Sequence, residues 1–234
     1  MLFILTGDVQ IGKTRWLIRL IEELAQRNIP SWGVVAPGVW GEEQAADPAL
    51  RAGGATQSPA CKQAAQLSES EHASHEVIRE KLGIDNVLLP AGHRIAFAKR
   101  HDLARADGMY GQHNESAKAR LAWSITDEAL AQVNAHFEDI ACTATNQGDH
   151  TEPGLLVVDE FGRLELQHDG GLTQAVRLIE QGPTERWPHA LIVVREWLID
   201  SARERFDAPW GATLIIGPDD KSREAVLTAF GQRA

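Results

Sequence analysis

The sequence predicts an α/β fold in which a mainly parallel sheet is covered by helices on both faces. Three wholly apolar runs support this prediction: LFIL at residues 2–5, LLVV at 155–158 and LIVV at 191–194. Segments with helical apolar spacing lie between such runs, and glycine or acidic residues follow the ends of the strands. Strands that are apolar throughout are buried on both faces, as in the parallel sheets of α/β proteins.

The amino-terminal half is expected to begin with a strand at residues 2–6 and a helix at 13–28. The apolar face of this helix consists of Trp16, Leu17, Leu20, Ile21 and Leu24, at the spacing of an amphipathic helix. A second strand is expected within residues 29–40, ending at Pro37-Gly38. Residues 86–100 have the pattern of a β-hairpin with a Pro-Ala-Gly-His turn.

The carboxyl-terminal half alternates helices with strands. A helix is expected over residues 119–145, with Thr126 as the N-cap of its main part. The remaining elements are a strand at 154–162, a helix at 171–181, a strand at 190–196, a short helix, a strand at 212–220 and a terminal helix.

The length of 234 residues suits one substantial core. We therefore expect a single domain over residues 1–234, interrupted by a polar surface insertion at about 41–80 that is rich in Ala, Gln, Ser and acidic residues. The net charge of −10 argues against a nucleic-acid or anionic-membrane partner, since both need clustered Lys and Arg. Cys61 and Cys142 lack metal-ligand spacing and suit free thiols in a reducing cytoplasm, the expected location.

A glycine-rich motif of the form G-x-x-x-x-G-K-[ST] joins the first strand to the first helix. It consists of Gly7, Asp8, Val9, Gln10, Ile11, Gly12, Lys13 and Thr14. The glycines let backbone N–H groups close on phosphate oxygens, and the following helix directs the positive end of its dipole at them. We expect Lys13 to reach the β- and γ-phosphates of a nucleoside triphosphate (ATP or GTP) and the Thr14 hydroxyl to bind Mg²⁺. Arg15 follows the loop and can approach the base.

Two acidic residues, Asp159 and Glu160, end the apolar run LLVV. Because an α/β fold brings the carboxyl ends of its parallel strands to one crevice, we expect both side chains beside the phosphate loop. Asp159 would accept a hydrogen bond from a magnesium-bound water, and Glu160 would act as general base toward the attacking water. Asp159 to Gly162 also fit the D-x-x-G pattern of regulatory GTPases, but no N-K-x-D motif for reading guanine is present.

Several segments together resemble the small P-loop nucleoside-triphosphatases of the thermostable, cancer-related NTPase family and their bacterial relatives. The segments are TGDVQIGKTRW, VVAPGVW, GIDNVLLPAGHRIAFAKR, WSITDEALAQVN and LLVVDEFGRLEL. The later family motif has the form Val-Asp-Glu-hydrophobic-Gly-basic-hydrophobic-Glu-Leu, and residues 158–166 follow it position by position.

This resemblance implies a RecA-like P-loop NTPase fold and Mg²⁺-dependent hydrolysis of several nucleoside triphosphates to diphosphate and phosphate. It is firm at residues 3–36, 83–100 and 155–195. After the second strand, APGVW and the polar insertion replace the family's short acidic-plus-arginine segment. The role of that segment and the base preference are therefore not carried over.

Hydrolysis usually needs a further cation to neutralise charge on the γ-phosphate. The candidates are Arg94, Arg100, Arg163 and Arg195. Arg163 lies in the family-like motif, and Arg195 ends a strand near the same sheet edge. We therefore expect these two residues to act in catalysis. For each of them, a surface ion pair is the alternative. Glu165 could orient Arg163 or a lytic water, or simply cap or pair.

The sequence thus predicts a Mg²⁺-dependent nucleoside-triphosphate phosphohydrolase, with Thr14 and Asp159 as metal ligands. The predicted catalytic residues are Lys13, Glu160, Arg163 and Arg195. A small-molecule kinase is an alternative, although the insertion that would close over its acceptor has few basic residues. A nucleotide-dependent accessory or switch protein is the third possibility, with Phe161, the insertion and exposed tryptophans contacting a protein partner.

Overall fold

The computed structural model describes residues 1–41, 80–106, 123–145 and 152–231. The chain divides into two compact units, residues 1–39 with 82–234, and residues 40–81. In the second unit the described residues are 40, 41, 80 and 81, where the Gly41 amide donates a hydrogen bond to the Glu80 carbonyl. The polar insertion predicted at 41–80 therefore lies almost wholly outside the described residues.

A sheet runs through the described part of the chain, with the strand order β6-β5-β4-β2-β7-β8-β1-β9 and with β3 paired to β4. Five neighbouring strands are parallel: β1 (Leu2–Leu5), β2 (Ser31–Val35), β7 (Leu155–Phe161), β8 (His189–Val194) and β9 (Thr213–Ile216). The antiparallel part consists of β4 (Lys81–Leu89), β5 (His93–Arg100) and β6 (Trp123–Ile125), and β3 is Gly38–Trp40.

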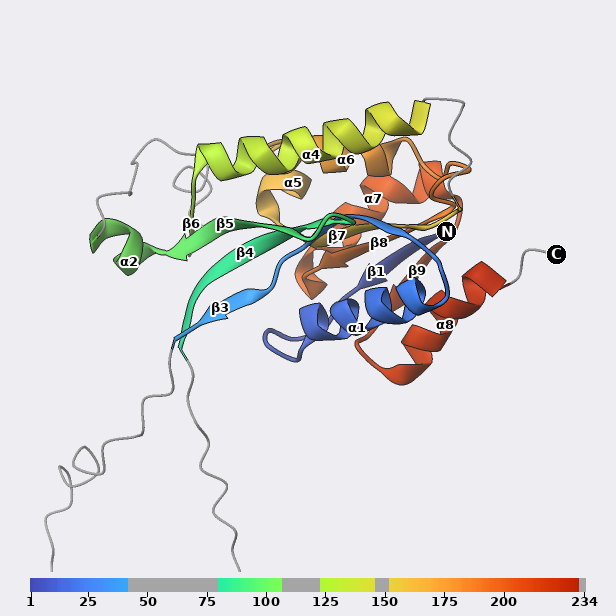
Figure 1. The fold of residues 1–234 in the computed structure, drawn as a ribbon, viewed down its shortest axis with the longest axis horizontal. Coiled ribbons are helices and arrows are strands. Elements are labelled where there is room, and N and C mark those ends of the chain that lie inside the picture. Colours follow the sequence, from blue (N-terminus) through green and yellow to red (C-terminus); the bar gives the residue numbers. More distant parts are fainter. Residues whose placement is uncertain (42–79, 107–122, 146–151, 232–234) are drawn as a thin grey trace, which may run out of the picture. The chain divides into compact units, whose positions relative to one another are not determined.

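Helices cover both faces of this sheet (Figure 1). One face carries α1 (Lys13–Gln26) and α8 (Asp220–Gly231). The other carries α4 (Asp127–Thr145), α5 (Arg163–Gln167), α6 (Thr173–Glu180) and α7 (Ile199–Trp210). Two short helices complete the described elements, α2 (His101–Ala106) after β5 and the 3₁₀ turn η2 (Glu196–Leu198) after β8. None of the helices within the described ranges is long and apolar enough to cross a bilayer.

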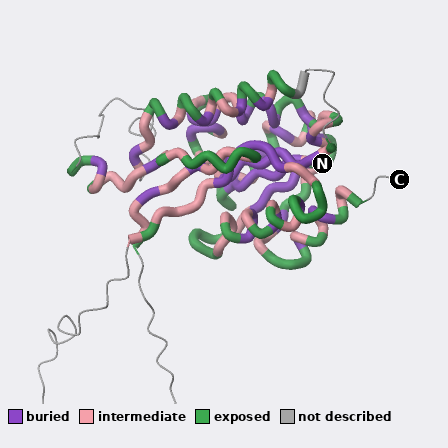
Figure 2. The backbone as a smooth tube through the Cα atoms, viewed as in Figure 1, coloured by how far each residue is buried: buried purple, intermediate pink, exposed green. Residues whose placement is uncertain are grey.

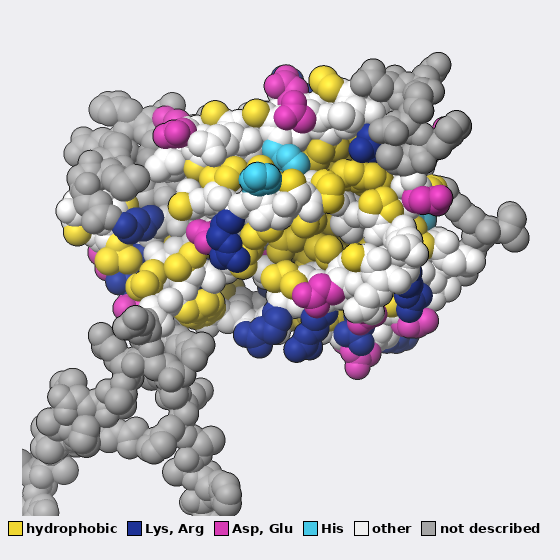
Figure 3. All heavy atoms as spheres, viewed as in Figure 1, with side chains coloured by type: hydrophobic (Ala, Val, Ile, Leu, Met, Phe, Trp, Pro, Cys, Tyr) yellow, Lys and Arg dark blue, Asp and Glu magenta, His cyan; other side chains and the backbone are white. Residues whose placement is uncertain are grey.

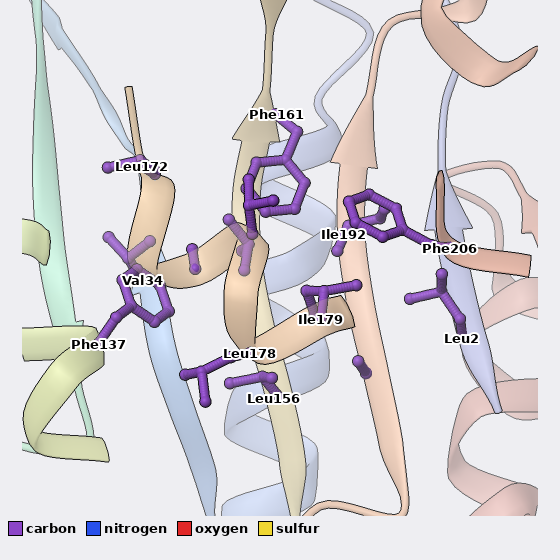
Figure 4. Packing of buried hydrophobic residues seen from close by; sticks show 14 of the residues in the cluster. Leu2, Val34, Phe137, Leu156, Phe161, Leu172, Leu178, Ile179, Ile192 and Phe206 are labelled. Carbon is purple, nitrogen blue, oxygen red and sulfur yellow. The ribbon is translucent and has the colours of Figure 1, made fainter. Parts of the chain in front are cut away.

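The two layers of helices explain why the central strands are apolar at every position. On β1, Leu2 and Ile4 belong to the cluster under α4, α6 and α7, part of which is drawn in Figure 4. Phe3 and Leu5 belong to the cluster under α1 and α8. Successive strand residues point to opposite faces, so a strand that is covered on both sides must be apolar throughout. Figure 2 shows this burial concentrated in the central strands.

Most predicted elements are confirmed, with three corrections. The expected second strand is two strands, because Pro37 has no N–H to donate to a ladder and separates β2 from β3. The helix expected from residue 119 begins at Asp127, because residues 123–125 pair with β5 as β6; residues 119–122 lie outside the described ranges. The Thr126 cap is confirmed, since its hydroxyl accepts from the Ala129 amide at 3.2 Å. The third correction is α5, which no pattern predicted.

Candidate active site

The strand order brings three loop segments to one edge of the sheet. β8 lies between β7 and β1, and all three are parallel. Their carboxyl ends therefore meet at the same edge, which carries the glycine-rich loop after β1, Asp159 and Glu160 at the end of β7, and Arg195 directly after β8. This arrangement is the usual position of ligand sites in α/β sheets.

The glycine-rich loop has a backbone shape that needs left-handed conformations. The φ angles are 130° at Gly7, 67° at Gln10 and 95° at Gly12. Helix α1 then starts at Lys13 with no side-chain cap and no acidic residue in its first turn. The first N–H groups of a helix are orphan donors that favour an anion. The start of α1 is therefore suited to a phosphate group, and Figure 3 shows Lys and Arg side chains gathered over this helix.

The Lys13 ammonium folds back over this loop. Its Nζ donates to the Gly7 carbonyl and to the Asp8 carbonyl, both at 2.7 Å. Burial lowers the pKa of Lys13, the negative charge of Glu160 opposes that shift, and the positive charge of Arg195 adds to it. The negative charges of Asp159 and Asp8 also oppose the lowering of the pKa of Lys13 by burial. The charged side chains at the ends of β7 and β8 thus lie within electrostatic range of the loop lysine.

Asp159 is a buried carboxylate held against β2. Its side chain is 4% exposed, and Oδ2 accepts a hydrogen bond from the Ala36 amide at 2.9 Å. No sequence pattern singled out this amide. Thr14, in the first turn of α1, is half-buried. A hydroxyl and a carboxylate are the oxygen donors that Mg²⁺ prefers, and this ion is often bound through few protein ligands plus substrate phosphates. The donor set therefore fits Mg²⁺, and no group of three His, Cys, Asp or Glu side chains in the described ranges forms a larger metal cage.

Glu160 has a strained backbone and an arginine partner. Its φ angle is 76°, at the point where the register of β7 against β8 shifts. Left-handed backbone at a residue other than glycine is costly and is concentrated at functional sites. The carboxylate oxygen Oε1 accepts from Arg195 Nε at 2.9 Å and from Nη2 at 2.8 Å. Both side chains are partly exposed, with 40% exposure for Glu160 and 46% for Arg195.

Glu165 forms a buried cap directly behind this turn. Its two carboxylate oxygens accept from the Gly162 amide at 2.8 Å and from the Leu172 amide at 3.0 Å. Burial raises the pKa of Glu165, and these two hydrogen bonds oppose that shift. Of the roles expected for Glu165, the capping role is the one that the structure shows. The turn that carries Glu160 is thereby tied to the start of α6.

The other predicted cations contact different groups. The Arg163 guanidinium lies 5.1 Å from the ring centre of Trp197, an exposed residue of η2. Arg94 pairs with Asp85 at 3.0 Å and Arg100 with Asp102 at 2.6 Å. Arg94 and Arg100 lie on β5, which β4 and β2 separate from β7. Of the four candidate arginines, Arg195 is the one with a hydrogen bond to Glu160. Trp197 was missed, although it follows Arg195 by two positions at the same sheet edge.

Two aromatic residues near the site are structural. Trp16 is 6% exposed, and its Nε1 donates to the Asp219 carbonyl at 2.9 Å. That bond joins α1 to the segment after β9. Phe161 is fully buried and stacks on Phe206, with ring centres 5.9 Å apart. The alternative of a switch protein placed Phe161 in contact with a protein partner, and this part of it is wrong because α7 covers Phe161.

The overall fold of this chain also occurs in solved structures. The solution structure of a human cancer-related nucleoside triphosphatase has a TM-score of 0.56 to this chain at 16% identity, covering 100% of this chain and 98% of that one. The crystal structure of THEP1 from the hyperthermophile Aquifex aeolicus has a TM-score of 0.55 at 13% identity, covering 98% and 96%. The chain has a P-loop NTPase fold.

This P-loop NTPase fold is the one that the family resemblance implied. No family model matches the sequence, and no curated protein matches it either. What is known of this chain therefore comes from its fold and from the residues at the carboxyl ends of its parallel strands. The glycine-rich loop of residues 7–14 has the sequence pattern of the P-loop and takes that name.

Proposed function

We propose that this chain hydrolyses nucleoside triphosphates to diphosphate and phosphate in a Mg²⁺-dependent reaction. The observation that carries the proposal is the meeting of the glycine-rich loop with Asp159, Glu160 and Arg195 at the carboxyl ends of the adjacent parallel strands β1, β7 and β8. The P-loop NTPase fold supports it, as does the structural similarity to a human nucleoside triphosphatase.

Triphosphate binding requires the P-loop to present donors toward the substrate. The first amides of α1 are free of side-chain caps and would receive the phosphate oxygens. Lys13 would exchange the Gly7 and Asp8 carbonyls for β- and γ-phosphate oxygens, which carry full negative charge and form stronger, charge-assisted bonds. The remaining P-loop residues and Arg15 would line the phosphate chain.

Thr14 and Asp159 would hold the metal. Bound Mg²⁺ would supply charge neutralisation on the β- and γ-phosphate oxygens. The hydrogen bond from the Ala36 amide fixes Oδ2 of Asp159, so this carboxylate is oriented before any ligand arrives.

Glu160 would act as the general base. It would accept a proton from a water whose oxygen attacks the γ-phosphorus, while the bond from that phosphorus to the β,γ-bridging oxygen breaks and its electrons leave with the diphosphate. The products would be a nucleoside diphosphate and inorganic phosphate. Because the sequence lacks a guanine-reading N-K-x-D motif, we propose that several bases are accepted.

The test is phosphate release from ATP, GTP, CTP, UTP and their deoxy forms, with and without Mg²⁺. We expect Mg²⁺-dependent turnover on several of them. Glu160→Gln should lower turnover by about 10²–10⁴-fold while nucleotide still binds, because it removes the proton acceptor. Lys13→Ala should reduce both binding and turnover.

Two outcomes would contradict this proposal. Tight nucleotide binding with almost no phosphate release by the wild-type chain would favour a switch protein or a kinase that lacks its acceptor. Turnover that survives in Glu160→Gln would remove Glu160 from the role of base.

A further inference from the structure

Glu160 and Arg195 form an ion pair with each other. Hydrolysis of a γ-phosphate would need Glu160 for the attacking water and Arg195 for the phosphate charge. Both guanidinium nitrogens bind the same oxygen, Oε1, at 2.9 and 2.8 Å. Nε and Nη2 of Arg195 therefore hold one of the two oxygens with which Glu160 could accept a proton. In this arrangement the proposed base is restrained by its neighbour.

The position of Arg195 allows a second partner. β8 lies between β7, which carries Glu160, and β1, which leads into the P-loop. Arg195, directly after β8, therefore lies between the strand that carries the proposed base and the strand that leads into the P-loop. Lys13, in turn, interacts electrostatically with both Arg195 and Glu160. An arginine in this position can reach toward either side of the site.

The ion pair is also of the kind that exchanges readily. Both side chains are more than a third exposed, and exposed ion pairs contribute little to stability. A γ-phosphate offers more negative charge and several acceptor oxygens to a bidentate guanidinium. The exchange from carboxylate to phosphate is therefore favourable once a triphosphate is bound.

We propose that Arg195 distinguishes triphosphate from diphosphate by leaving Glu160 for the γ-phosphate. This inference rests on the proposed function. A diphosphate in the same P-loop ends at its β-phosphate, so Arg195 stays on Glu160 and the base remains restrained. A triphosphate draws Arg195 away, and Glu160 becomes available to water only when there is a γ-phosphate to attack.

The test compares equilibrium affinities for a diphosphate and a non-hydrolysable triphosphate. Isothermal titration would use ADP and its β,γ-imido triphosphate counterpart, and the guanosine pair, all with Mg²⁺. Arg195→Ala should weaken imido-triphosphate binding by about tenfold or more, the scale of a charge-assisted hydrogen bond, and ADP binding by less than about threefold. Arg203→Ala is the matched control, because Arg203 forms an exposed ion pair with Asp207 on α7.

Glu160→Gln provides the sharper measurement. The neutral amide cannot hold Arg195 as an ion pair, so imido-triphosphate binding should tighten by about three- to tenfold, with ADP unchanged. In the Arg195→Ala background the same substitution should bring no gain. Loss of the Glu160 charge also reduces its repulsion of the triphosphate. That effect does not depend on Arg195, so it would tighten binding equally in the Arg195→Ala background.

The outcomes separate this inference from the proposed function. A gain from Glu160→Gln that persists in Arg195→Ala overturns the exchange, as does an equal loss of ADP and imido-triphosphate binding in Arg195→Ala. In both cases hydrolysis itself stands. A wild-type chain that binds neither nucleotide overturns the proposed function, and the exchange with it. Thermal melting of each variant checks that the fold is intact.

Discussion

Two glutamates on either side of the junction between β7 and α5 have opposite surroundings. The Glu160 side chain is 40% exposed and is held by the side chain of Arg195, which is itself 46% exposed. Glu165 is 6% exposed and accepts from two backbone amides that cannot move without moving the chain. Glu160 can exchange partners at little cost, whereas Glu165 cannot. One short segment thus combines a partly exposed carboxylate, the proposed base, with a buried carboxylate that fixes the backbone after it.

The largest expected effect comes from displacing Glu165. Gly171 has a φ of 69°, and an added Cβ would lie 1.9 Å from Glu165 Oε1. We expect Gly171→Ala to lower the free energy of unfolding by about 3–4 kcal/mol, since it combines backbone strain with a buried clash. Gly211 is the matched control: its φ is 64° and a Cβ there meets nothing within 4 Å.

Denaturant unfolding would measure both glycine variants. Gly211→Ala should cost about 1–2 kcal/mol, from the left-handed conformation alone. Equal losses of unfolding free energy in Gly171→Ala and Gly211→Ala would mean that the hydrogen bonds of Glu165 add nothing to stability.

The second prediction replaces each glutamate by its amide. In Glu165→Gln, the side-chain NH₂ must face one of two backbone N–H groups, so we expect a loss of about 1–3 kcal/mol in stability from an unsatisfied buried donor. Glu160→Gln should change stability by less than about 1 kcal/mol, because its ion pair is exposed. Thermal and denaturant unfolding of the two variants would test this contrast, and a larger loss at Glu160 would reverse it.

The third prediction concerns pH. Burial lowers the pKa of Lys13, so the free chain loses this proton at a lower pH than an ordinary lysine does. The protonated form binds phosphate, and the affinity for an imido triphosphate should therefore fall by about tenfold per pH unit above that pKa. Titrations in buffers of different ionisation enthalpy should show proton uptake on binding. An affinity that stays constant into the ordinary lysine range would contradict this prediction.

The smallest effect is expected at the stacked pair beside the site. The Arg163 guanidinium lies over the Trp197 ring, which is 55% exposed. A double-mutant cycle with Arg163→Ala and Trp197→Ala should give a coupling energy of about 0.5–1 kcal/mol in stability, the range of exposed cation–π contacts. A coupling several times larger would show that this pair supports the turn as Glu165 does.

The sequence by itself determined the local features of this protein. The P-loop with its strand and helix, the apolar runs of β1, β7 and β8, the acidic pair at the end of β7 and the Thr126 cap all depend on residues that are close in the chain. Spacing and propensity report such features because neighbouring residues alone decide them. The strand β6 was missed: a helix was expected to begin at residue 119, but residues 123–125 pair with β5 instead.

Only the tertiary structure decided which distant groups meet. The partner of Glu160 is Arg195, 35 residues away along the chain, and the choice among four arginines depended on β8 lying next to β7. The amide that fixes Asp159 comes from Ala36, 123 residues earlier. Such contacts depend on strand order and register, which are set by the burial of the whole sheet rather than by any local pattern.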